Sequence, residues 1–452
     1  MSLTLDEIRS CLDGVIPGVV ATCAPDGTPN VSFLSQAEYV DAEHVALSFQ
    51  FFSKTRENIL RNPLAAISLV DPLTGANYAI DLEYLRTETQ GPLFARMKAK
   101  LAGIASHQGM TGVFRLLGSD VYRVLHIEGQ SAGTIAPPEP RRNLLAASRT
   151  YAEHVAACQD LHELLNTTLG DIESLLGVRH AMILMLDAPG ERLYTVASRG
   201  YVSSGAGAEI PLGQGVIGMA AAERCAIRIA FTTAEYSYGR AVRESAARSE
   251  HAAQLETAIP FAGLADPQSQ IAVPILAPQQ RLVGVLYADS DEERRFNYED
   301  EDALMVFASQ LGGAIAALPA APPEARTAAS RALAAARVAG AKLAVRHFAE
   351  NDSVFFGDDY VIKGIAGAIL WVLLADYAQS GRTEFSNRAL RLDPRLRFPD
   401  VNDNLEARLI LLERRLADRS APVRIAKTGR GRFCLDVRTG LELHDVPRPA
   451  RR

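Results

Sequence analysis

Two short segments combine hydroxyl, amide and cationic side chains in a way suited to holding phosphate. The first is Ser53–Asn58, where hydroxyls and an ammonium stand at the expected start of a short helix between two strands. Such a helix N-terminus supplies both the donors and the positive charge that a phosphate dianion needs. The second is Lys427–Arg432, a basic turn between two short strands that follows a leucine-faced helix. A helix followed by a basic hairpin suits binding to a phosphate backbone.

Other motifs carry less chemistry. Gly213–Gly218 reads GxGxxG, but a dinucleotide fingerprint should open a helix directly after the first strand of a βαβ unit, and here two antiparallel-looking strands precede it. His162-Glu163 is half of a zinc-protease helix motif, because Asn166 stands where the second histidine is required. The five cysteines are scattered and contain no CxxC pair, which argues against a disulfide framework and a structural zinc site.

Length and composition predict a multidomain protein. A chain of 452 residues, of which 48% are hydrophobic and 22% charged, exceeds what one core usually serves, so we expect about three domains. No apolar run approaches the ~20 residues that span a bilayer, and no secretory signal stands at the N-terminus. The expectation is a cytoplasmic protein without a membrane segment.

Positive charge is concentrated at the C-terminal end. Residues 381–452 hold 17 Lys and Arg against 10 Asp and Glu, a net charge of +7, so the preceding residues carry −13 of the total of −6. This asymmetry favours an anionic partner for the C-terminal part, although a solvated arginine-rich surface would also explain it.

Two proline-containing segments divide the chain. They predict domains over 1–128, 150–318 and 351–452, joined by a linker over 129–149 and an alanine- and proline-rich linker helix over 319–350. The overall fold class that we expect is multidomain α+β.

The first domain reads as a small barrel of strands. Predicted strands cover 18–22, 29–34, 45–52, 65–70 and 121–127, with a helix before the last of them. The order strand, Ser-Lys, short helix, Asn-Pro, strand resembles the split-barrel family related to pyridoxamine 5′-phosphate oxidase, which usually binds FMN and forms homodimers. The resemblance implies Ser53, Lys54, Thr55 and Asn58 as phosphate contacts. Haem or deazaflavin are alternative cofactors, and the oxidase's Arg- and His-rich substrate-binding tail is not visible.

The second domain resembles the GAF family, an α/β sandwich. An opening helix near 161–172 is followed by strands over 181–186 and 193–197 and by the glycine turn at 213–218. Strands over 270–275 and 283–289 then lead to a helix capped by Asn297. The resemblance implies a sensor of small molecules whose ligand stays unknown, since the cyclic-nucleotide signature is missing. The polar insertion over 232–268 could form a lid or an ordinary solvated loop.

The third domain resembles the winged-helix effector domain of response regulators. We expect a helix over 359–379, a second element over 383–390, a helix that starts near Asn404 and a final hairpin of two strands. The resemblance implies that the helix enters the major groove of DNA and the hairpin the minor groove. It implies the following DNA contacts: Asn404, Arg408, Lys427, Thr428, Arg430 and Arg432.

The leading interpretation is a cytoplasmic regulator that couples flavin or small-molecule sensing to transcription. Two other classes stay open: an FMN-dependent oxidoreductase with regulatory domains, for which no catalytic residue can be named, and a cofactor-free scaffold that contacts proteins. Dimerisation is expected because family flavins lie at the subunit interface, and it would place two winged helices on paired half-sites.

Overall fold

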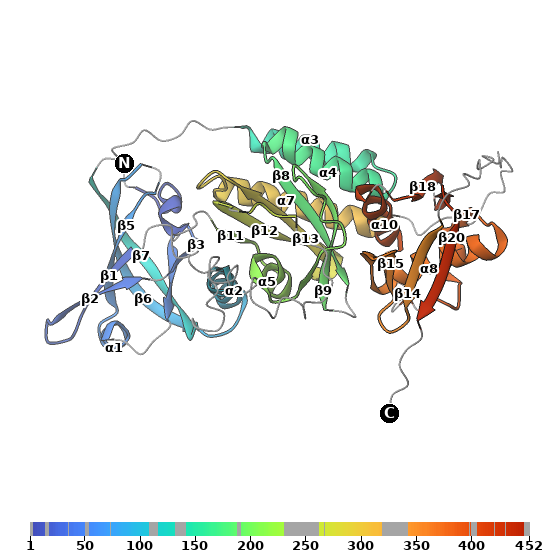
Figure 1. The fold of residues 1–452 in the computed structure, drawn as a ribbon. Coiled ribbons are helices and arrows are strands. Elements are labelled where there is room, and N and C mark those ends of the chain that lie inside the picture. The colour runs from blue at the N-terminus through green and yellow to red at the C-terminus, as the bar shows by residue number, and fades with distance from the viewer. Residues whose placement is uncertain are drawn as a thin grey trace, which may run out of the picture.

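The structure, a computed structural model, describes residues 3–13, 18–34, 36–49, 54–72, 74–107, 116–131, 142–187, 191–229, 262–265, 267–318, 342–396, 398, 405–419, 421–429 and 431–446. Figure 1 shows three folded parts, with the N-terminal and C-terminal parts on opposite sides of the central one. None of the described helices is both long and apolar enough to cross a membrane.

The N-terminal part is a seven-stranded antiparallel sheet that curls around one core. Its elements are η1 (Arg9–Asp13), β1 (Gly18–Cys23), β2 (Pro29–Leu34), β3 (Ala37–Asp41), β4 (His44–Phe49), α1 (Lys54–Arg61), β5 (Leu64–Val70), β6 (Asn77–Glu88), α2 (Pro92–His107) and β7 (Gly118–Ser131). The strand order is β2-β1-β5-β6-β7-β4-β3. The predicted hairpin is confirmed as β1–β2, and Gly27 provides the positive φ of its turn. Alternate residues of β1 point into the core, as a half-buried strand requires.

The central part is a six-stranded antiparallel sheet with helices on both faces. Its elements are α3 (Leu144–Ala157), α4 (Leu161–Leu176), β8 (His180–Asp187), β9 (Arg192–Arg199), β10 (Glu209–Pro211), α5 (Gly215–Glu223), β11 (Ile227–Ile229), β12 (Ser269–Ala277), η3 (Pro278–Gln280), β13 (Arg281–Ser290) and α7 (Tyr298–Ala317). The strand order is β10-β9-β8-β13-β12-β11. Helices α3, α4 and α7 bury one face and α5 the other. Asn297 caps α7 in a reciprocal capping box with Asp300, as predicted.

The C-terminal part contains two small sheets around a buried helix. Its elements are β14 (Leu343–Phe348), β15 (Ser353–Phe356), β16 (Asp359–Ile362), α8 (Gly364–Ser380), β17 (Glu384–Ser386), α9 (Asn387–Arg391), α10 (Leu405–Asp418), β18 (Val423–Gly429), β19 (Arg432–Val437) and β20 (Leu441–Val446). One sheet has the order β16-β15-β14-β20 and the other β17-β19-β18. The helix and hairpin predicted from residue 404 onward are confirmed as α10 and β18–β19.

Two expectations for this part are wrong. Residues 343–348 do not continue a linker helix but form β14, whose alternating apolar side chains pair with β15 and, in parallel, with β20. Residues 359–362 form β16, and helix α8 starts only at Gly364, whose φ of 65° is a value that glycine adopts without strain. In both places strand pairing, of β14 with the distant β20 and of β16 with the adjacent β15, overrides the local helical pattern.

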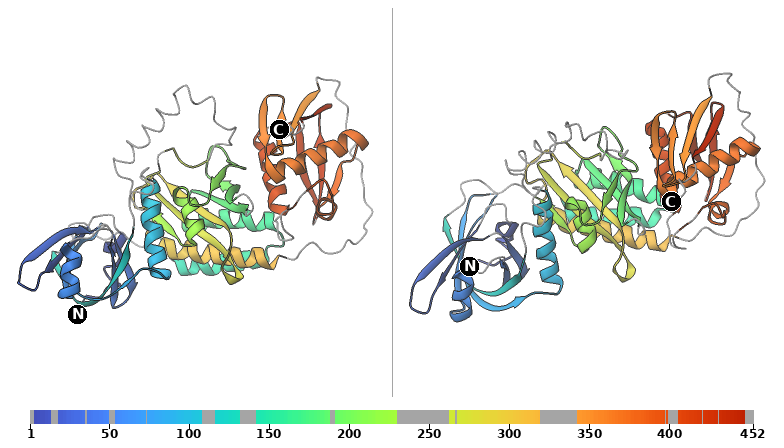
Figure 2. Two further views of the ribbon diagram at one scale, coloured as in Figure 1. Left: turned by 90° about the horizontal axis from the view of Figure 1, so that it is seen from below. Right: turned by 60° about the horizontal axis from the view of Figure 1, so that its bottom comes forward.

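The three parts touch one another through defined elements. Helix α2 of the N-terminal part packs against α5 of the central part, and Figure 2 shows it, in light blue, between the two sheets. On the other side, α10 of the C-terminal part packs against β9 and α4. Both contacts lie on elements that also build the central domain's own core.

Candidate functional site

The first candidate site lies at the start of α1, which packs on the hairpin β1–β2. The Thr55 hydroxyl accepts a hydrogen bond from Asn30 Nδ2 at 2.9 Å and shares another with Ser32 Oγ at 3.0 Å. Lys54 has a side chain 55% exposed and its Nζ lies 3.5 Å from a carboxylate oxygen of Glu57. Ser53 lies outside the described residues. A half-buried set of uncharged donors therefore adjoins an exposed ammonium at a helix N-terminus.

Asn58 belongs to the protein interior and not to this surface. Its side chain is buried, and its Nδ2 donates to the Thr22 hydroxyl at 3.1 Å. Arg56, two residues earlier, pairs with Asp120 of β7, and its guanidinium lies 4.5 Å from the centre of the Phe49 ring. These two residues fasten α1 to the sheet.

The donor set fits the phosphate of a flavin mononucleotide. Lys54 would provide charge, and Asn30, Ser32 and Thr55 would provide neutral donors at a helix N-terminus. Asn30 and Ser32 were missed in the sequence, although their spacing of two on a predicted strand places them on one face. That spacing could not predict their proximity to Thr55, because Thr55 lies 25 positions after Asn30 and 23 after Ser32 and reaches them only through the packing of α1 on the hairpin.

A buried carboxylate organises one end of the central sheet. Asp289 Oδ1 accepts a hydrogen bond from the Tyr201 hydroxyl at 2.9 Å, and Oδ2 accepts one from the backbone amide of Leu264 at 2.9 Å and one from the Tyr287 hydroxyl at 3.4 Å. Burial raises the pKa of the Asp289 carboxyl. This cluster ties two connecting segments to β13, on the sheet face that α5 covers.

The glycine motif of the central domain closes a turn. The amide of Gly213 donates to the carbonyl of Gly218 at 2.8 Å, and a Cβ on Gly218 would lie 2.3 Å from the carbonyl oxygen of Pro211. Because β8 and β9 before it are antiparallel, the motif does not belong to a βαβ unit. Gly218 thus permits the close approach of α5 to β10, whereas Gly213 and Gly215 have the positive φ values of the turn. The expected lid segment lies largely outside the described residues, and in the described part of the chain no three His, Cys, Asp or Glu side chains gather as metal ligands.

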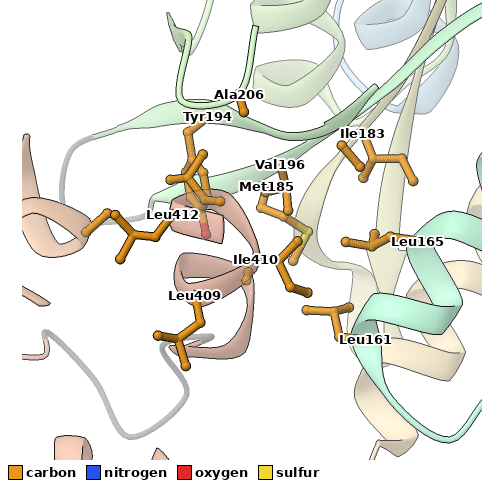
Figure 3. Packing of buried hydrophobic residues seen from close by; sticks show 14 of the residues in the cluster. Leu161, Leu165, Ile183, Met185, Tyr194, Val196, Ala206, Leu409, Ile410 and Leu412 are labelled. Carbon is orange, nitrogen blue, oxygen red and sulfur yellow. The ribbon is translucent and has the colours of Figure 1, made fainter. Parts of the chain in front are cut away.

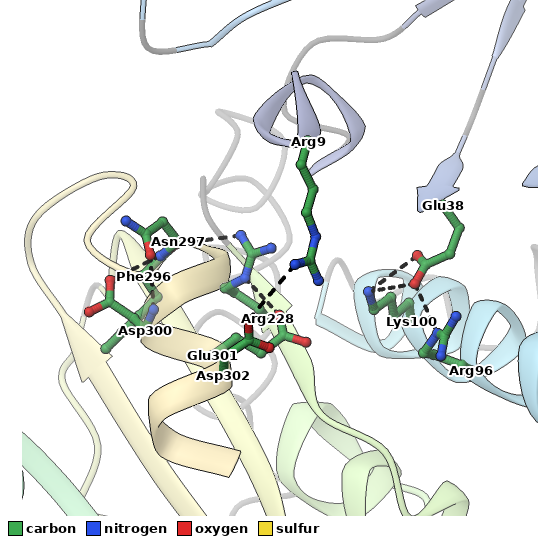
Figure 4. A network of polar contacts seen from close by, with 10 residues as sticks. All are labelled: Arg9, Glu38, Arg96, Lys100, Arg228, Phe296, Asn297, Asp300, Glu301 and Asp302. Carbon is green, nitrogen blue, oxygen red and sulfur yellow. Dashed lines mark hydrogen bonds and ion pairs between the residues drawn. The ribbon is translucent and has the colours of Figure 1, made fainter. Parts of the chain in front are cut away.

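The N-terminal and central domains meet at a group of charged and aromatic side chains (Figure 4). Two guanidinium groups share the Tyr298 ring, that of Arg9 at 4.3 Å and that of Arg228 at 4.5 Å from its centre. Arg9 Nη1 lies 3.8 Å from the Asp302 carboxylate, and Arg228 Nε lies 2.9 Å from that of Glu301. The start of α7 is thus a contact point for the N-terminal domain.

The predicted DNA contacts divide into three groups. Asn404 and Arg430 lie outside the described residues, while Thr428 and Arg432 are exposed on the hairpin β18–β19. Arg408 and Lys427, by contrast, face the central domain: Arg408 Nη2 lies 2.8 Å from Asp187 Oδ1, and Lys427 pairs with Asp160. The guanidinium of Arg408 also lies 4.2 Å from the centre of the Tyr194 ring.

Apolar side chains continue this contact between the domains. Figure 3 shows Ile410 of α10 beside Met185 of the central sheet and Leu161 of α4, while Leu409 and Leu412 lie on other sides of the same helix. All of them belong to a single hydrophobic cluster that runs through both domains. Two further arginines of α10 have partners in different domains. Arg414 donates to Asn166 of α4 in the central domain at 2.7 Å, and Arg415 donates to the backbone carbonyl of Val361 in its own domain at 3.0 Å.

Comparison with known families matches the first two domains. Residues 4–116 match the family model of pyridoxamine 5′-phosphate oxidase, and residues 160–315 match that of the GAF domain. Neither match extends into the C-terminal domain. No curated protein matches the chain.

Three solved structures are similar to parts of this chain. An FMN-binding protein from Syntrophomonas wolfei is 17% identical, with 28% of this chain and 86% of that one covered and a TM-score of 0.25. A free methionine-R-sulfoxide reductase from Neisseria meningitidis is 22% identical, with 39% and 89% covered and a TM-score of 0.30. The GAF domain of an Acinetobacter phosphoenolpyruvate-protein phosphotransferase is 19% identical, with 38% and 92% covered and a TM-score of 0.30. The family matches themselves show that the chain carries a pyridoxamine 5′-phosphate oxidase-like domain followed by a GAF domain.

Proposed function

We propose that this chain is a regulatory protein in which the oxidase-like domain and the GAF domain sense a flavin or another small molecule, and the C-terminal domain delivers the response by binding duplex DNA. The observation that carries the proposal is the hydrophobic cluster shared by the GAF sheet and α10. Because packed cores respond to a shift by repacking, a change in the GAF sheet has a direct route to α10.

The C-terminal domain has the chemistry of a winged helix that binds phosphate. A helix with Arg408 precedes a hairpin with Lys427, Thr428, Arg430 and Arg432, and the domain lies in the basic part of the chain. In our proposal α10, preceded by Asn404, enters the major groove and the hairpin follows the minor groove. Neutralisation of ~4 phosphates corresponds to a log–log salt slope of roughly −3.6.

For the N-terminal domain we propose FMN, with its phosphate at Lys54, Thr55, Asn30 and Ser32. Ser53, next to them in sequence, is a further proposed contact. When bound, a flavin supplies reversible electron and hydride chemistry, so this domain would report redox state. In the proposal, the residues of this chain hold the phosphate through one ammonium and neutral donors.

We further propose that the chain forms a homodimer through the N-terminal domain. Val31 and Phe33 of the edge strand β2 are 64% and 83% exposed. Exposed apolar side chains gathered on one edge of a sheet mark a protein contact. A second copy of the chain would cover them, and two C-terminal domains would then face paired DNA sites.

Two measurements on the purified full chain test the proposal. An absorption spectrum reports whether flavin is retained, and fluorescence anisotropy with a mixed-sequence DNA duplex at several salt concentrations reports binding and its slope. We expect Arg432→Ala to weaken DNA binding and to flatten the slope by about 1. A chain that ignores duplex DNA in dilute buffer, both as wild type and with Asp187→Asn, contradicts the DNA output. Turnover of NAD(P)H by a yellow protein would favour the oxidoreductase instead.

A further inference from the structure

We infer that the GAF domain holds the C-terminal domain in a closed state by binding, with its own aspartates, the same cations that would contact DNA. The inference rests on the proposed DNA output. In this state the GAF domain and DNA compete for α10 and the hairpin, and a signal that loosens the GAF face would release them.

The ionic contacts carry the first part of the argument. The side chain of Arg408 is only 6% exposed, and its guanidinium lies between the Asp187 carboxylate and the Tyr194 ring. Lys427, on the hairpin, reaches Asp160 at the N-terminus of α4, where that carboxylate also accepts a hydrogen bond from the amide of Glu163 at 3.0 Å. Two acidic groups of one domain thus take the place that two phosphates would occupy.

The apolar contacts carry the second part. One side of α10 packs against α8 of its own domain, and the other side lies on β9 and α4 of the GAF domain. Ile410 of α10 lies beside Met185 of β8 and Leu161 of α4 (Figure 3), and all three are buried in the shared cluster. A helix covered on both sides cannot enter a DNA groove, so separation of the two domains must precede insertion.

Exposed residues of the hairpin remain outside the contact. Thr428 and Arg432 are exposed in the closed state, so they can make a first, weak contact with DNA before α10 is released. The full affinity requires Arg408 and Lys427. The closed population therefore lowers the apparent affinity by the fraction of molecules that are open.

Zero-length carbodiimide crosslinking of the full chain tests the closed state without reference to DNA. The reagent should join Lys427 to Asp160 by an amide bond, which mass spectrometry of the digested protein identifies. We expect this crosslink in the free protein, and we expect a saturating DNA duplex to reduce it several-fold. Absence of the crosslink, or its persistence at full strength in the DNA complex, would overturn the inference while leaving DNA binding itself intact.

A charge variant provides the second measurement. Asp187→Asn leaves the Arg408 guanidinium without its carboxylate in the closed state, so we expect DNA affinity to rise at least about tenfold and the crosslink to weaken. The matched control is Glu173→Gln, which makes the same change in net charge on the GAF surface but removes the partner of Arg199 within that domain. Equal affinity changes in the two variants indicate a general charge effect and contradict the inference. A normal crosslink with no DNA binding by any variant contradicts the proposed DNA output instead.

Discussion

The division of labour between Asn58 and Lys54 gives a prediction whose magnitude follows from the structure. Asn58 is 1% exposed and Thr22 is 5% exposed, and the amide of the first donates to the hydroxyl of the second. Asn58→Ala leaves this hydroxyl buried with one donor fewer, a loss that costs about 1–3 kcal/mol. At ~2 kcal/mol, the equilibrium between closed and open forms of the N-terminal sheet shifts ~30-fold.

Hydrogen exchange followed by mass spectrometry measures this shift domain by domain, which suits a chain with several folded units. Amides of β1 and α1 should exchange about 5–150-fold faster in Asn58→Ala, since 1–3 kcal/mol spans that range. A double-mutant cycle with Thr22→Ala should show positive coupling, because the two residues share one hydrogen bond.

Lys54→Ala is the matched comparison at the same helix. Its side chain is mostly exposed, so exchange in β1 should stay within the effect of ~0.5 kcal/mol that is usual for surface substitutions. The affinity of the variant for FMN should fall. Among the described cations at this helix N-terminus, Arg56 is held by the buried Asp120, so Lys54 is the one that can turn to a phosphate. Unchanged exchange together with weakened FMN binding in Asn58→Ala would refute the reasoning and return Asn58 to the phosphate site.

Three further predictions concern the other two domains. Gly218→Ala should destabilise the GAF domain strongly, since its Cβ would lie 2.3 Å from a backbone oxygen. Gly170→Ala, with open space around it in α4, should be neutral or stabilising by up to ~1 kcal/mol. Thermal melting of the two variants compares these effects. Asn297→Ala removes the capping box of α7 and should cost about 1 kcal/mol, measured by exchange of the first turn of that helix. The third prediction concerns pH. Burial alone would lower the pKa of His347, but hydrogen bonds from its ring to Asp352 and Asp445 raise this pKa overall. The contribution of His347 to stability is therefore complete below the ordinary histidine pKa and is lost as pH rises through the raised pKa. Exchange of β20 amides should therefore accelerate with pH beyond the intrinsic rate in the wild type and lose that excess in His347→Gln; an identical pH profile in both would contradict the assignment.

Local patterns were sufficient to predict most helices and the antiparallel hairpins. Two β-type runs around an Asp-Gly turn predicted β1 and β2, alternating apolar residues predicted β19, and the capping residue Asn297 marked the start of α7. The same reasoning failed at β14 and β16, where an alanine-rich or apolar stretch looks helical, but β14 pairs with the distant β20 and β16 pairs with the adjacent β15. A strand is stabilised by the strands it pairs with, and a short apolar run does not by itself show whether such partners exist.

The candidate site residues show the same limit. That Ser53–Asn58 begins a helix between two strands follows from nearby residues, but that Asn58 turns inward and Thr55 meets Asn30 and Ser32 depends on how α1 packs on the hairpin. The sequence predicted phosphate contact for both Lys54 and Asn58, but the structure places Lys54 at the surface and Asn58 in the interior.

What the sequence determined by itself is the identity of the first two domains, the order of most elements and the basic character of the C-terminal end, because periodicity, caps and turn residues act over a few positions. Only the tertiary structure decided which charged side chains of the C-terminal domain form ion pairs with the central domain and which stay exposed. Arg408 meets Asp187 across 221 positions and Lys427 meets Asp160 across 267. Such partners are brought together by the packing of whole domains, and the burial of an ionic pair depends on that packing rather than on the residues around it.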